Sequence, residues 1–150
     1  MVKITGGYQG ELNCTAVHAP SGALISTDAP KDNQGKGEAF SPTDLVATAF
    51  ATCIATTMAL VARKHSVDLA GLRYEVIKEM SSTLPRRISR LTVQLWMPAA
   101  AKQLPADLME KTARGCPVYE SLGPEVEKVI QFHWAVLPGA AAAGATPGSR

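Results

Sequence analysis

Residues 45–62 form a run without a charged side chain, and this run limits the fold more than any other part of the chain. The run is long enough to cross a membrane. However, alanine is its commonest residue and four threonines interrupt it, so transfer into lipid would be weakly favourable at best. A helix that is apolar on most sides and stays out of a membrane must be buried within protein. We therefore predict a buried central helix and no membrane partner.

The residues on both sides of this run mark the ends of the predicted helix. Ser41 is a favourable N-cap, Pro42 suits the first helical position, and Asp44 stands three residues after the cap, as in a capping box. A basic cluster at residues 63–65 suits the negative end of the helix dipole. The helix is therefore predicted to run from Pro42 to about Lys64.

The rest of the chain shows patterns typical of strands and short helices. Alternating apolar residues between glycine- and proline-containing turns predict strands at residues 2–8, 11–17, 23–27, 72–80, 88–97 and 129–136. Further helices are predicted at residues 105–114 and 117–122. A mobile loop over residues 28–40 and a hairpin loop over residues 84–87 complete the pattern. The predicted fold class is α+β.

The composition fits a single domain, because 46% of the 150 residues are hydrophobic and can form one core. Fifteen basic and thirteen acidic residues leave a formal charge of +2, without a run of like charges, so no nucleic-acid partner is expected. Three cysteines are few for a secreted disulfide scaffold, and the first residues lack the apolar core of a signal peptide. We therefore expect a cytoplasmic protein.

Domain organisation and assembly follow from what the chain can bury. Residues 139–150 are mainly alanine and glycine and cannot bury enough apolar surface to fold. One domain is therefore predicted over residues 1–138, followed by a disordered tail over residues 139–150. Covering the central helix on most sides needs more surface than one small sheet and two short helices provide. We therefore expect a homodimer in which the central helices meet.

Two of the three cysteines, Cys53 and Cys116, are predicted to lie on helices. Cys53 falls within the buried helix, where an inert core cysteine and a reactive one both fit the position. Cys116 precedes Pro117 at a helix start, where unsatisfied N–H groups should lower the pKa of its thiol. Cys116 with His133 could act as nucleophile and base, but a third orienting group is missing. No cysteine or histidine pair has the spacing of metal ligands, so neither a metal nor another cofactor is expected.

The order of these elements and two motifs resemble the OsmC/Ohr family of hydroperoxide-reducing proteins. The first motif is the Ser-Pro-x-acidic-Leu segment at residues 41–45, followed by a run of small residues up to Cys53. The second is the Cys-Pro-Val-x-x-Ser-Leu segment at residues 116–122. The resemblance covers the chain up to about Leu137.

The resemblance implies an intertwined homodimer with antiparallel sheets, a central buried helix and two active sites at the interface. It implies a thiol-dependent peroxidase in which Cys53 is the peroxidatic and Cys116 the resolving cysteine. Apolar residues around Cys53 would favour organic hydroperoxides over hydrogen peroxide; they are Phe50, Ile54 and Met58. An external dithiol partner would reduce the resulting disulfide.

The sequence departs from the family pattern in the charged groups expected near Cys53. Family members that reduce peroxides efficiently use an arginine from the N-terminal part, whereas here no arginine precedes Arg63. Several basic residues could supply the charge instead, namely Lys31, Lys36, Arg86, Arg87 and Arg90. Asp44 stands where some branches carry a glutamate, and it either acts across the dimer or only completes the capping box. Cys14 matches no functional position and is interpreted as structural.

Two alternative functions stay open on the sequence alone. The same scaffold could hold a small apolar or electrophilic ligand in the dimer cleft without reducing peroxides efficiently. It could also be a stress-induced dimer whose cysteines are only core residues.

Overall fold

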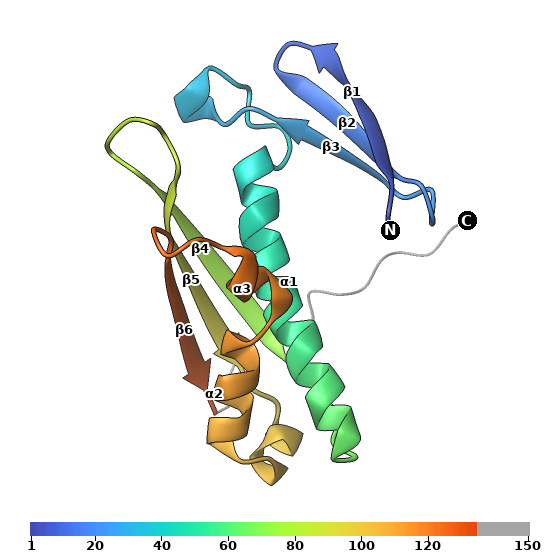
Figure 1. Ribbon diagram of the computed structural model, residues 1–150, viewed down its shortest axis with the longest axis vertical. Helices are drawn as coiled ribbons and strands as arrows, with labels where there is room; N and C mark the ends of the chain where they lie inside the picture. Colours follow the sequence, from blue (N-terminus) through green and yellow to red (C-terminus); the bar gives the residue numbers. More distant parts are fainter. Residues whose placement is uncertain (135–150) are drawn as a thin grey trace, which may run out of the picture.

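The computed structural model describes residues 1–134, which form two three-stranded sheets, one long helix and two short helices (Figure 1). The strands are β1 (Ile4–Gly10), β2 (Asn13–His18), β3 (Leu24–Asp28), β4 (Arg73–Met80), β5 (Ile88–Trp96) and β6 (Glu127–His133). The helices are α1 (Pro42–Lys64), α2 (Ala106–Arg114) and α3 (Pro117–Ser121), with 3-10 turns at Lys31–Asn33 and Ala99–Gln103. The predicted α+β class with a central helix is confirmed. The predicted tail and the domain limit at residue 138 lie outside the described residues.

Helix α1 begins and ends where the sequence predicts. The Asp44 amide donates to Ser41 Oγ at 3.1 Å, and the Ser41 amide donates to Asp44 Oδ2 at 2.8 Å, which completes the capping box. Six residues of α1 enter the core, and they are Ala47, Phe50, Ala51, Ile54, Met58 and Ala62. By length and hydropathy α1 would also suit a membrane span, as core helices of folded proteins often do.

The second sheet, β4-β5-β6, supplies the other half of the core. Leu91, Val93 and Leu95 of β5 are completely buried on the face that meets α1. Strand β4 pairs antiparallel with β5, as expected, whereas β6 pairs parallel with β5. The reason is the long connection after β5, which passes through α2 and α3 and returns β6 to the end of the sheet where β5 began.

The first sheet, β1-β2-β3, is the predicted antiparallel meander. Figure 1 shows it beyond the N-terminal end of α1, apart from the second sheet. Three of its large apolar side chains are mostly exposed, namely Ile4 at 66%, Tyr8 at 65% and Leu24 at 63%. The part of the chain that the structure describes therefore leaves apolar surface on this sheet without cover.

One face of α1 also lacks cover from the rest of residues 1–134. Ala49, Thr56 and Leu60 are exposed and recur at intervals of seven and four residues, which places them on one side of the helix. Leu60 is 55% exposed although it is a large apolar residue. Cys53 lies four residues after Ala49, at the border between this stripe and the core.

Candidate active site

The structure brings two of the three cysteines, Cys53 and Cys116, to neighbouring positions. Cys53 lies midway along α1 and is half-buried, whereas Cys116 is completely buried at the N-cap of α3. Helix α3 packs against α1, and both thiols belong to the same core cluster. Each thiol thus comes from a different helix, as the sequence predicts.

Burial raises the pKa of the Cys116 thiol above its ordinary value, and the adjacent Cys53 thiol raises it further. Hydrogen bonds from the backbone N–H groups of Tyr119 and Val118 lower the pKa of Cys116, but by less than burial and Cys53 raise it. The Tyr119 N–H donates to Cys116 Sγ at 3.3 Å, so the predicted cap is confirmed. The predicted lowering of the pKa is wrong, because α3 has only five residues and Cys116 exposes no surface. The raised pKa therefore disfavours the thiolate form of Cys116.

The apolar residues expected around Cys53 are core residues. Phe50, Ile54 and Met58 have no exposed surface, so they hold α1 in place and cannot contact a substrate within one chain. The half-buried Cys53 remains the thiol of the pair that a reagent can approach. An accessible thiol beside a buried thiol is an arrangement that would allow oxidation of the first, followed by a disulfide with the second.

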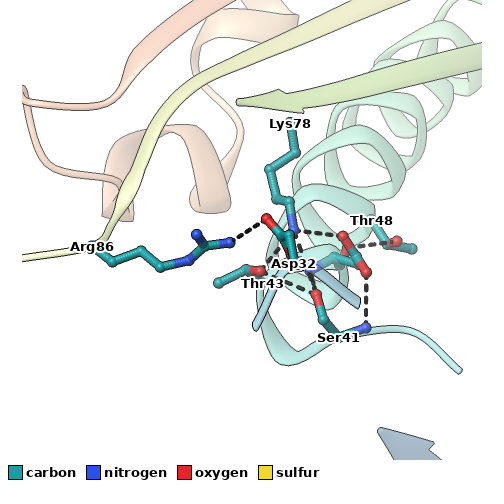
Figure 2. A network of polar contacts seen from close by, with 7 residues as sticks. Asp32, Ser41, Thr43, Thr48, Lys78 and Arg86 are labelled. Carbon is teal, nitrogen blue, oxygen red and sulfur yellow. Dashed lines mark hydrogen bonds and ion pairs between the residues drawn. The ribbon is translucent and has the colours of Figure 1, made fainter. Parts of the chain in front are cut away.

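A polar network joins the start of α1 to strand β4 (Figure 2), and its hydrogen bonds include Asp44. The Lys78 ammonium donates to Asp44 Oδ1 at 2.6 Å, to Thr43 Oγ1 at 2.7 Å and to Ser41 Oγ at 3.4 Å. The Lys78 side chain is only 16% exposed, so these three acceptors replace most of its water. The capping role of Asp44 is therefore confirmed, and Lys78 is an additional partner that sequence analysis missed.

Burial alone would raise the pKa of Asp44, but hydrogen bonds from Lys78 and Ser41 outweigh it and hold the pKa below the usual value of 3.8. The ionised Asp44 carboxylate therefore stabilises the folded state above about pH 4. This contribution to the free energy of unfolding is lost as the pH falls through the lowered pKa of Asp44. Nine helical residues separate Asp44 from Cys53, which places the two side chains on opposite sides of α1 and roughly 13 Å apart along its axis. Asp44 thus does not share a site with the Cys53 of its own chain.

Replacing Lys78 by methionine should lower the free energy of unfolding by about 1–3 kcal/mol, because Asp44 loses a charged hydrogen-bond donor at a half-buried position. Urea unfolding at pH 7 measures the effect. Lys102→Met is the matched control, since Lys102 is exposed and should change stability by less than about 0.5 kcal/mol. Equal stability of the two variants would show that the network does not support α1.

The basic residues considered from sequence lie elsewhere. Arg86 Nη2 donates to Asp32 Oδ2 at 2.8 Å (Figure 2), and Arg90 forms two hydrogen bonds with Glu127. Within residues 1–134, no hydrogen bond joins Cys53 to Lys31, Lys36, Arg86, Arg87 or Arg90. Lys78 could have been found from the alternation in β4, where it shares the inward face with Val76 and Met80.

Two cavities flank the polar network. One of about 540 Å³ is lined by residues 37–40, Ala47, Val76 and the Asp44–Lys78 pair. The other, of about 380 Å³, lies between the first sheet and the start of α1 and is lined by Cys14 and Arg86 among others. Cys14 is exposed on β2, so it is not a core cysteine. Over the described part of the chain, no three His, Cys, Asp or Glu side chains gather as metal ligands would.

The fold and the thiol pair define an α+β protein with a dithiol site. Residues 35–130 match the family described as OsmC-like protein, and the chain belongs to this family. A comparison with curated protein sequences found no match.

Solved structures show the same fold. A protein of Psychrobacter arcticus 273-4, provisionally described as an osmotic stress induced and detoxification response protein, is 40% identical, with a TM-score of 0.81 over 89% of this chain and 96% of that one. An organic hydroperoxide resistance protein of Elizabethkingia anophelis is 15% identical, with a TM-score of 0.71 over 88% and 94% of the two chains. The organic hydroperoxide resistance protein OsmC of Legionella pneumophila is 14% identical, with a TM-score of 0.69 over 88% and 96%. For the last two proteins, at 15% and 14% identity, the similarity shows a shared fold and no more.

Proposed function

We propose that this protein is a cytoplasmic, thiol-dependent peroxidase that reduces organic hydroperoxides through Cys53 and Cys116. The observation that carries the proposal is the pairing of a half-buried thiol with a completely buried one on an adjoining helix. Two of the solved structures with the same fold are named for organic hydroperoxide resistance, which supports the same chemistry. Of the two thiols, Cys53 is the accessible one, so it is assigned the attacking role.

The proposed reaction has three balanced steps. The Cys53 thiolate attacks the distal oxygen of the hydroperoxide, the O–O bond breaks, and the departing alkoxide takes a proton to become an alcohol. The Cys116 sulfur then attacks the Cys53 sulfenic acid, which forms a disulfide and releases water. A dithiol reductant restores both thiols by exchange and is itself oxidised to a disulfide. The raised pKa of Cys116 disfavours its thiolate, so Cys53 is the thiol that attacks the hydroperoxide in the first step.

The proposal includes a homodimer in which the α1 helices meet. The exposed stripe of Ala49, Thr56 and Leu60 on α1 and the exposed apolar residues of the first sheet support it, because the described residues of one chain leave both without cover. Cys53 borders this stripe, so each active site would lie beside the proposed dimer interface. Asp44 also remains a proposed site residue, and in this dimer it would act on the Cys53 of the partner.

Replacing Leu60 by glutamate should weaken the dimer by roughly 100-fold or more, because a charge would be buried at the helix contact without a partner. Sedimentation velocity at micromolar concentration measures the change. Lys102→Glu, on an exposed turn, is the control and should leave the dimer intact. A wild-type protein that sediments as a monomer at that concentration would contradict the proposed assembly.

Turnover with a dithiol tests the enzymatic function. The purified protein should consume cumene hydroperoxide with dithiothreitol as reductant and should consume hydrogen peroxide more slowly. If cumene hydroperoxide is consumed no faster than by dithiothreitol alone, the proposed peroxidase function is contradicted.

A second function, binding of a small apolar ligand, is favoured by the cavity of about 540 Å³ beside Phe40, Ala47 and Val76. Its volume lies in the range of small-molecule sites. This function would be preferred if cumene hydroperoxide left both thiols reduced while cumyl alcohol bound the wild-type protein and not a Val76→Trp variant, whose larger side chain would occupy the cavity.

A further inference from the structure

One basic side chain, that of Lys128, makes all of its polar contacts within residues 1–134 with the segment that carries Cys116. Lys128 lies on β6, is half-buried, and donates from Nζ to the carbonyl oxygens of Leu122 at 2.9 Å and Gly123 at 3.1 Å. These carbonyls stand at and just after the C-cap of α3, where a positive charge is favourable. Among residues 1–134, no carboxylate lies within ion-pair distance of Lys128. Its charge is therefore directed entirely at the end of α3.

The same ammonium lies over the ring of Tyr119, 5.0 Å from its centroid. The Tyr119 ring in turn packs against Phe50 of α1, with the centroids 6.0 Å apart and the rings tilted by 34°. Phe50 is completely buried one turn before Cys53. The amide of Tyr119 donates to Cys116 Sγ. Tyr119 thus contacts the cation, the helix of Cys53 and the thiol of Cys116.

Helix α3 needs such external support. With five residues it is far too short to be stable by itself. Cys116 has no exposed surface, so its thiol can meet Cys53 only while α3 stays packed on α1. Side-chain contacts of Lys128 reach α3 from β6, which is anchored in the sheet beside β5. The contacts of Lys128 therefore hold the short helix α3 against the second sheet.

From this geometry we propose that Lys128, acting through Tyr119, is a positioning residue for the second step, in which Cys116 attacks the Cys53 sulfenic acid. The inference rests on the proposed peroxidase function. Lys128 touches neither thiol, so its removal leaves the first step, oxidation of Cys53, unchanged. Removal of the Lys128 side chain slows the second step, because α3 then holds Cys116 in position to attack for a smaller fraction of the time.

The test follows the two steps separately after adding one equivalent of cumene hydroperoxide to the full-length, reduced protein. Trapping with dimedone measures Cys53 sulfenic acid, and acid quenching with intact mass measures the disulfide. Lys128→Met should oxidise Cys53 within about twofold of the wild-type rate, whereas disulfide formation should slow by about tenfold or more. The Cys53–dimedone adduct should accumulate accordingly. Lys102→Met is the control and should match the wild type in both steps.

Two further variants keep the test decisive if Lys128→Met folds poorly. Lys128→Arg retains a cation that can reach the same carbonyls and should restore disulfide formation to within about threefold of wild type. Tyr119→Leu keeps the amide that caps Cys116 but removes the ring, and should slow the disulfide step by about threefold or more. Disulfide formation at the wild-type rate in folded Lys128→Met, or in Tyr119→Leu if the former does not fold, would overturn the positioning role. If the wild type itself forms no sulfenic acid, the peroxidase proposal fails instead.

Discussion

Replacing Cys53 by serine is expected to reduce the rate of cumene hydroperoxide consumption by about 1,000-fold or more. A serine hydroxyl stays protonated at neutral pH and lacks the polarisable sulfur that attacks an O–O bond, so the first step should be lost. Cys53 is the accessible member of the thiol pair, which is why the effect should fall on this residue. The hydroperoxide that remains after mixing with enzyme and dithiothreitol measures the rate.

Cys14→Ser is the matched control for that experiment. Cys14 is exposed on β2 and does not belong to the core cluster that holds the other two thiols, so its replacement should leave the rate within about twofold of wild type. If Cys53→Ser kept full activity while Cys116→Ser lost it, the attacking and resolving roles would be reversed.

Replacing Cys116 by serine should separate the two chemical steps. Oxidation of Cys53 should continue within about threefold of the wild-type rate, whereas turnover with a dithiol should fall by at least about tenfold, because no internal disulfide can form. The oxidised variant should gain the mass of one oxygen at Cys53 and should react with dimedone.

This substitution suits the local structure. Serine is a preferred N-cap residue, and its hydroxyl can accept the Tyr119 N–H that Cys116 Sγ now accepts. The variant should therefore fold, and a loss of turnover can be assigned to the missing thiol. An oxidised Cys116→Ser protein that contained an intramolecular disulfide from Cys53 to Cys14 would contradict the assigned resolving role.

The sequence predicts the elements whose signals are local. The N-cap at Ser41, the capping box with Asp44 and the end of α1 at Lys64 depend on neighbouring residues, and all three are found as expected. Cys116 at the cap of α3 is a local feature as well. The family could also be named from two short motifs, because each joins a helix start to one of the two cysteines.

Features that depend on contacts between distant segments were missed. Alternation in β6 indicates which face of the strand is buried, but not whether it runs parallel to β5. The pKa of Cys116 was expected to fall because the helix start is visible in the sequence, whereas the burial that raises it comes from α1 and the second sheet. Alternation in β4 places Lys78 on the inward face, but only the fold brings Lys78 against Asp44 and Lys128 against Tyr119.

Intact mass with peptide mapping, after one equivalent of cumene hydroperoxide is added to the reduced wild-type protein at neutral pH, tests the central claim most directly. We predict a rapid loss of two hydrogens that maps to a disulfide between Cys53 and Cys116. Thiols that stay reduced for many minutes, or that oxidise only as slowly as free cysteine, would contradict the peroxidase function and favour the ligand-binding one.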